Sequence, residues 1–186
     1  LYVAACEPGS GKSLVVLGLM ELVSRRVECP GFFRPVIRSD KKRDNDTDLL
    51  LRRYSLDQAY EDSYGVTSDE AMSLTREKGL TALLKRILSR YKAIEARSDF
   101  VLCEGTDFTG VTSAFEFDLN SQIATQLGTP VLSVISGRDR SVGSIRDAAE
   151  ATRSALAEQG CTVTGTVVNR VAPAGLPTIR ERLASD

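Results

Sequence analysis

Short apolar runs recur along the chain, and longer segments separate them. The runs are nearly continuous in valine, isoleucine, leucine and phenylalanine and do not alternate with polar residues. Such runs are typical of parallel strands that are covered on both faces. They predict five strands, over residues 1–5, 32–37, 99–103, 130–136 and 162–168.

The segments between these runs carry helical patterns. Over 79–96, apolar residues recur every three or four positions and form one stripe. The helix predicted over 144–159 opens with a capping-box pattern, Ser144 to Asp147, and stops at Gly160. Further helices are predicted over 13–26, about 118–127 and 177–186. The polar stretch 38–68 is expected to form loops, with one short helix that starts near Asp46. Strands alternating with helices predict an α/β fold, a doubly wound and mainly parallel sheet with helices on both faces.

The length of 186 residues suits a single domain spanning 1–186. The chain begins with Leu1 instead of methionine. It ends on a predicted helix that no strand follows, although sheets of this kind normally continue. We therefore expect a piece of a longer polypeptide, truncated at the C-terminal end of the domain.

Composition narrows the function classes. Hydrophobic residues make up 42% and charged residues 26% of the chain, as in ordinary globular proteins. A net charge of −1 gives no electrostatic reason to expect nucleic acid or a membrane as partner, and no apolar run approaches the length of a membrane span. The absence of histidine excludes Ser-His and Cys-His catalysis within this chain. Scattered cysteines argue against zinc and favour a reduced, cytoplasmic chain with thiols in or near the core: Cys6, Cys29, Cys103 and Cys161.

The stretch "AACEPGSGKS" (residues 4–13) lies between a predicted strand and a predicted helix, the context that a phosphate-binding loop requires. Gly9, Ser10 and Gly11 are expected to curl so that backbone N–H groups face phosphate oxygens. Lys12 would reach the β- and γ-phosphates, and the Ser13 hydroxyl would bind Mg²⁺. The alternative is a glycine-rich turn without function. Where the usual pattern begins with glycine, this chain has cysteine.

Carboxylates follow two of the predicted elements. Asp44, Asp46 and Asp48 lie near a helix start, where they could hold Mg²⁺ through water or serve as helix caps. Glu104 and Asp107 follow the third strand, at the sheet edge where such proteins hold a metal ion. We expect Asp46 and Glu104 to contribute to a metal site, although a glutamate at a strand end can also be a plain surface residue.

Two further strand ends carry polar side chains. Arg34 and Arg38 accompany the second strand and could contact an anionic ligand, or they could be solvated. Asn169 ends the last strand, where an asparagine can pair with an adenine edge or simply form a turn. We expect Arg34 and Asn169 to take part in binding the nucleotide.

The segments "ACEPGSGKS", "FFRPV", "DNDTDLLLRRYSL", "CEGTDF" and "VVNRVAP" occur in the order seen in dethiobiotin synthetase-like P-loop proteins, and the resemblance spans nearly the whole chain. This superfamily includes an ATP-dependent carboxylating ligase and the N-terminal domain of long phosphate acetyltransferases. The resemblance implies ATP or a related nucleotide with Mg²⁺ as cofactors, and homodimers or larger assemblies.

The chain departs from the ligase in two places. Arg34 stands where the ligase carries a lysine, and the bulky Phe108 stands where it has small residues. The segment "FDLNSQIATQLGTPVLSVISGRD" resembles the phosphate acetyltransferase domain instead. The resemblance therefore implies a regulatory nucleotide- and metabolite-sensing domain with no catalytic residue of its own, joined to a separate C-terminal acetyltransferase domain. A ligase and an interaction module with a vestigial loop are the alternatives.

Overall fold

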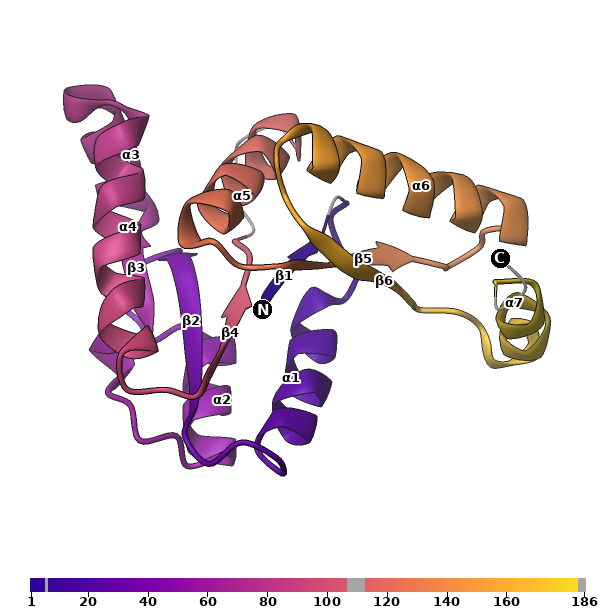
Figure 1. The fold of residues 1–186 in the computed structure, drawn as a ribbon, viewed down its shortest axis with the longest axis horizontal. Helices are drawn as coiled ribbons and strands as arrows, with labels where there is room; N and C mark the ends of the chain where they lie inside the picture. Colours follow the sequence, from indigo (N-terminus) through magenta and orange to yellow (C-terminus); the bar gives the residue numbers. More distant parts are fainter. Residues whose placement is uncertain (6, 107–112, 184–186) are drawn as a thin grey trace.

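The sheet has six strands, all parallel, in the order β3-β2-β4-β1-β5-β6 (Figure 1). The computed structural model describes residues 1–5, 7–106 and 113–183. The strands are β1 (Tyr2–Ala5), β2 (Pro30–Ile37), β3 (Tyr64–Thr67), β4 (Phe100–Glu104), β5 (Val131–Ser136) and β6 (Val163–Asn169). Because the strands are parallel, the loops after β1, β2, β4 and β6 emerge at one edge of the sheet.

Helices cover both faces of this sheet, as the alternation of elements predicts. α1 and α2 pack on one face, and α4, α5 and α6 pack on the other (Figure 1). The helices are α1 (Lys12–Val23), α2 (Asn45–Arg53), α3 (Ser68–Lys78), α4 (Leu80–Glu95), α5 (Ser113–Leu127), α6 (Val142–Glu158) and α7 (Leu176–Leu183), with short 3-10 turns at Tyr60–Asp62 and Pro173–Gly175. The predicted doubly wound α/β class is confirmed.

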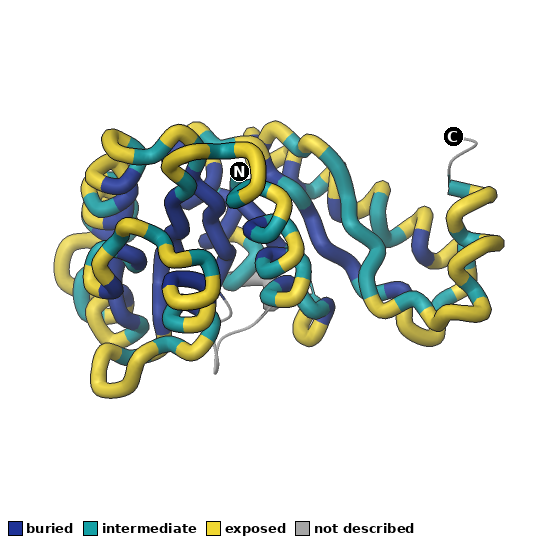
Figure 2. The backbone as a smooth tube through the Cα atoms, turned by 90° about the horizontal axis from the view of Figure 1, so that it is seen from below, coloured by how far each residue is buried: buried dark blue, intermediate teal, exposed yellow. Residues whose placement is uncertain are grey.

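The core consists of two apolar layers, one on each face of the sheet, and Figure 2 shows the buried strands between more exposed helices. Successive strand residues point to opposite layers. Phe33 packs with Tyr91 and Ile94 of α4, whereas the neighbouring Phe32 packs in the layer that holds Met20 of α1. Both phenylalanines are fully buried. Burial on both faces explains why these strands have continuous apolar runs.

The stretch 38–68 contains more structure than the loops and one helix predicted for it. β3 joins the sheet edge beside β2, with Tyr64 opposite Arg34. The strand has four residues, one of them glycine, so its apolar signal is weak. α3 follows it at once and was not predicted, although Thr67 and Glu70 form a capping box at its start.

The five predicted strands are present, with ends shifted by a residue or two, and the predicted helices are present with corrected boundaries. Residues 184–186 of the helix predicted over 177–186 lie outside the described residues. The capping box expected from Ser144 to Asp147 is wrong, because α6 begins at Val142 and Ser141 is its N-cap. The hydroxyl of Ser141 accepts a hydrogen bond from the backbone N–H of Ser144. α5 starts several residues earlier than about 118, and α1 ends before 26. Within the described residues no helix is long and apolar enough to cross a membrane.

Candidate functional site

The loop between β1 and α1 has the backbone shape that a phosphate loop requires. Gly9 and Gly11 both have positive φ, 70° and 84°, and α1 begins at Lys12 directly after them. A Cβ atom on Gly11 would lie 2.3 Å from Nδ2 of Asn169, so the position has no room for a side chain. Ser10, between the glycines, is buried. The loop therefore places the positive end of α1 at the carboxyl edge of the sheet.

Asn169, at the end of β6, fastens this loop to the sheet. Its Nδ2 donates to the carbonyl oxygen of Ser10 at 2.8 Å and to that of Gly11 at 3.4 Å. The side-chain amide nitrogen is therefore committed to the loop backbone. The contact with an adenine edge that the sequence suggests stays a prediction.

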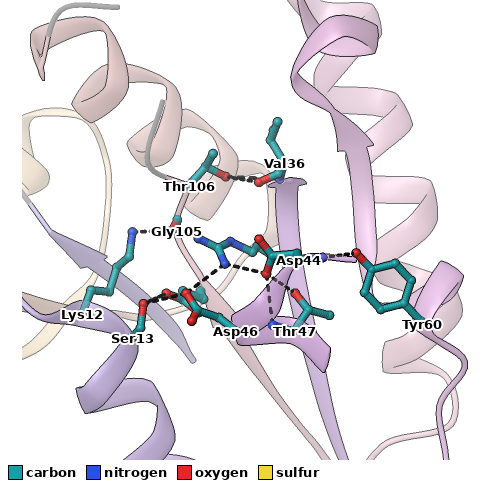
Figure 3. Close-up of polar contacts among 11 residues, drawn as sticks. Lys12, Ser13, Val36, Asp44, Asp46, Thr47, Tyr60, Gly105 and Thr106 are labelled. Carbon is teal, nitrogen blue, oxygen red and sulfur yellow. Dashed lines mark hydrogen bonds and ion pairs between the residues drawn. The ribbon is translucent and has the colours of Figure 1, made fainter. Parts of the chain in front are cut away.

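Lys12 is almost fully buried, at 4% exposure, and its ammonium group donates to the carbonyl oxygen of Gly105 (Figure 3). Gly105 directly follows β4. A buried ammonium group facing the loop is a suitable partner for phosphate oxygens, because it loses little further hydration when it binds them.

Ser13, Asp46 and Glu104 come together, as the sequence predicts, from α1, α2 and β4. The Ser13 hydroxyl lies 2.8 Å from Oε1 of Glu104 and 3.0 Å from Oδ2 of Asp46 (Figure 3 labels Ser13 and Asp46). Two carboxylates therefore share one hydroxyl beside the phosphate loop. The positive charges next to them are Arg34, 3.3 Å from Asp46, and Lys12.

Glu104 is more deeply buried than Asp46. Its side chain is fully buried, and Oε2 has no hydrogen-bond partner within the described residues. Burial raises the pKa of its carboxyl group, while the charges of Arg34 and Lys12 act in the opposite direction. A buried carboxylate oxygen without a partner is costly unless a ligand engages it.

The residues fit a magnesium ion that keeps much of its water shell. Mg²⁺ prefers oxygen ligands and usually takes one or two carboxylates in phosphate-binding sites. Ser13, Asp46 and Glu104 supply such oxygens, and the unpartnered Oε2 of Glu104 is the observation that favours a ligand there. The described part of the chain has no cluster of three or more histidine, cysteine, aspartate or glutamate residues suited to a metal, so a cage of protein ligands alone is absent there.

Arg34 lies in β2 and contacts the α2 start instead of open solvent. Its Nη1 is 2.8 Å from Oδ1 of Asp44 and 3.3 Å from Oδ2 of Asp46. Asp44 is also the N-cap of α2, because it accepts a hydrogen bond from the Thr47 backbone N–H. The capping role left open for the aspartates therefore belongs to Asp44. Asp48 instead forms exposed ion pairs with arginines.

A buried polar network around Asn120 was missed in the sequence. Its Oδ1 accepts from the Tyr2 hydroxyl at 2.6 Å and from the Thr106 N–H at 2.9 Å, and its Nδ2 donates to the carbonyls of Thr106 and Glu116. Thr106 also bonds Val36 of β2 through its hydroxyl (Figure 3). The network fixes the segment that follows Glu104. The sequence did contain a signal for this network, because Asn120 is a polar residue within the apolar stripe of a predicted helix.

Glu7 was also missed, and it ties the phosphate loop to β5. It forms a two-point ion pair with Arg140, with its shorter contact at 2.6 Å, and accepts from the Ser136 N–H. Both side chains are about 30% exposed.

Some predicted residues do not join the site. Asp107 and Phe108 lie outside the described residues, as does Cys6. Cys103 and Cys161 are buried as expected, and burial raises the pKa of the Cys103 thiol to about 12. Cys29 is exposed, so the expectation that it lies in or near the core is wrong.

The parallel sheet, the glycine-bearing loop before α1 and the buried lysine define a P-loop-like nucleotide-binding fold. The chain belongs to the AAA domain family, whose sequence profile matches residues 1–184. This result and the relatives below confirm the resemblance to the P-loop domain of long phosphate acetyltransferases.

Two curated relatives are named phosphate acetyltransferase. The protein of Nitratidesulfovibrio vulgaris is 45% identical over 172 residues, which cover 91% of this chain and 24% of the relative. That of Synechocystis sp. is 37% identical over 175 residues, covering 93% of this chain and 25% of the relative. The chain therefore spans about a quarter of the length of these relatives.

A comparison with solved structures agrees on the fold. The BceF tyrosine kinase domain superposes with a TM-score of 0.50 at 19% sequence identity, over 92% of this chain and 68% of that domain. At this identity the likeness concerns the fold alone.

Proposed function

We propose that this chain is a nucleotide- and metabolite-sensing domain that regulates a phosphate acetyltransferase. It binds ATP or a related nucleotide with Mg²⁺, and it carries no acetyl-transfer residue of its own. The transfer between acetyl-CoA and phosphate belongs to a separate domain, C-terminal on the same cytoplasmic polypeptide, in a homo-oligomer.

The observation that carries this proposal is the group Lys12, Ser13 and Glu104 at one loop. Lys12 is buried and Glu104 has a buried oxygen without a partner in the described chain, so both gain from a bound metal and phosphate. Lys12 would bind the terminal phosphates. Ser13, Asp46 and Glu104 would hold Mg²⁺, which neutralises phosphate charge when bound. Gly9, Ser10 and Gly11 would present backbone N–H groups to the phosphates.

The ligase alternative is less well supported by the geometry. In the ligase a lysine stands at position 34, whereas Arg34 here is held by Asp44 and Asp46 at the start of α2. A side chain engaged in two ion pairs is poorly placed to act as a mobile point charge. We therefore expect no ATP-dependent carboxylation of a diamine substrate above the level of a Lys12→Ala control.

Binding is tested first, by calorimetry with ATP and other adenine and guanine nucleotides in the presence of Mg²⁺. Lys12→Ala should weaken binding about tenfold to a hundredfold, because it removes a charge-assisted contact worth about 1.5–3 kcal/mol. Lys85→Ala, an exposed lysine on α4, is the matched control and should bind like the wild type. If no nucleotide binds at millimolar concentration, the domain is not a nucleotide sensor.

Regulation is tested in the full-length parent protein. A nucleotide site can alter a distant active site only by binding two conformations with different affinity. Lys12→Ala and Glu104→Gln should leave acetyl transfer intact and shift the effector midpoint about 5- to 150-fold, the range for a coupling of about 1–3 kcal/mol. The same measurements are made on a truncation without residues 1–186. If kinetics, effector response and oligomer size are unchanged in both variants and in the truncation, the domain does not regulate the enzyme, and the interaction module is the function that remains.

A further inference from the structure

A cavity lies between the end of β2 and the start of α2, and one of its lining residues, Asp46, contacts Ser13 next to the phosphate loop. Its volume is about 450 Å³, within the range of pockets for small metabolites. The lining is polar and strongly basic: Arg34, Val36, Arg38, Ser39, Lys42, Arg43, Asp44, Asn45 and Asp46.

The four cations of this lining differ in their partners. Arg34 is paired with Asp44 and Asp46, and Arg43 is paired with Asp48 at 2.7 Å while its guanidinium stacks on Tyr60.

Arg38 and Lys42 form no ion pair or side-chain hydrogen bond within the part of the chain that the structure describes. Arg38 and Lys42 therefore line the pocket without a paired carboxylate, because the two carboxylates of the lining, Asp44 and Asp46, are paired with Arg34. Like charges gathered around one cavity repel each other, and an anion between them removes that repulsion.

The pocket is adjacent to the loop site but does not coincide with it. Arg34 and Asp46 belong to both, since Asp46 also contacts the Ser13 hydroxyl. Lys12 and Glu104 do not line the pocket. A ligand here would therefore lie on the α2 side of Asp46, next to the predicted metal and apart from the loop backbone.

We propose that this pocket binds a small dianion, a phosphate monoester or a dicarboxylate, through Arg38 and Lys42. Two separate cations match a ligand whose two negative charges lie within one small molecule. The arginine can make paired hydrogen bonds to a planar carboxylate or to phosphate, and the lysine adds a point charge. The proposal goes beyond nucleotide binding, because it assigns a second ligand to residues that the nucleotide does not need.

The test measures anion binding to the wild-type chain by calorimetry at constant ionic strength. The probes are inorganic phosphate, glycerol 3-phosphate and succinate, with acetate as the monoanion and glycerol as the uncharged control. The variants are Arg38→Gln, Lys42→Gln and the double variant. Lys41→Gln is the matched control, because Lys41 is exposed in the same segment but does not line the pocket.

We expect at least one dianion to bind more tightly than acetate, and each single variant to weaken it about tenfold. Comparing the binding of phosphate and glycerol 3-phosphate with that of succinate then shows whether the pocket prefers a phosphate or a dicarboxylate. Lys41→Gln should bind like the wild type. Dianion binding no tighter than acetate binding, or equal losses in Lys41→Gln and the pocket variants, would overturn the proposal.

The nucleotide experiment keeps the two proposals separate. Lys12→Ala should lose nucleotide affinity and retain the dianion, whereas Arg38→Gln should do the reverse. If Arg38→Gln weakens ATP binding as much as dianion binding, and ATP displaces the dianion, the pocket belongs to the nucleotide site. The proposal of a second site is then refuted. Nucleotide binding without dianion binding refutes this inference alone.

Discussion

Replacing Asn120 with alanine tests whether the buried network supports the site. The side chain is 5% exposed and uses its full hydrogen-bonding capacity in bonds with Tyr2, Thr106 and Glu116. Each such bond contributes about 1 kcal/mol net, and four of them lost together predict a free energy of unfolding lower by about 4 kcal/mol. For a chain of this size that corresponds to a fall in Tm of about 8–16 °C.

The assay is urea unfolding followed by circular dichroism, with Asn45→Ala as the control. Asn45 is exposed at the start of α2, so its replacement should change the free energy of unfolding by less than about 0.5 kcal/mol. Tyr2→Phe removes one bond of the network. Adding it to Asn120→Ala should cost less than it does alone, because the shared bond is already absent. A loss within about 1 kcal/mol of the Asn45→Ala value would refute the reasoning.

Two other predictions concern the loop and its carboxylate. Burial raises the pKa of Glu104 above its ordinary value of 4.5, so the folded chain retains a proton that the unfolded chain has lost. Without metal, stability should therefore fall as pH rises through that window. Glu104→Gln should abolish this component, and an unchanged pH slope in urea unfolding would contradict it. Gly11→Ala should destabilise the fold by about 1–3 kcal/mol and weaken nucleotide binding, because φ is positive and Asn169 fills the space. Gly143→Ala in α6, where a Cβ would lie 3.9 Å from Oγ of Ser141 in an ordinary contact, should be neutral or stabilising by comparison in thermal unfolding.

The sequence was informative where one signal dominated. Continuous apolar runs identified β1, β2, β4, β5 and β6, because burial on both faces leaves no room for polar alternation. β3 was not predicted, because an edge strand of four residues is too short to show a clear run of apolar residues.

For the site, the order of motifs brought Ser13, Asp46 and Glu104 together correctly, since parallel strands end at one edge. Which side chains would pair with one another could not be predicted from the sequence. That Arg34 would pair with Asp44, or that Asn120 would join Tyr2 across more than a hundred residues, depends on the packing of α2 and α5 against the sheet.

The contacts of Asp46 imply that ligand binding at this edge is an exchange of partners. In the chain alone, this carboxylate contacts the Ser13 hydroxyl and is paired with Arg34. Ser13 belongs to the proposed metal site, so Arg34 is the partner that competes with a cation for Asp46. A metal ion bound as proposed would have to loosen the pairing with Arg34. A cost of about 0.5–1.5 kcal/mol would place its affinity about two- to twelvefold below that of a site without this pair. Such a site responds at higher ligand concentrations and releases its ligand sooner. Removing the internal competitor should therefore tighten binding while making the domain slower to follow changing levels.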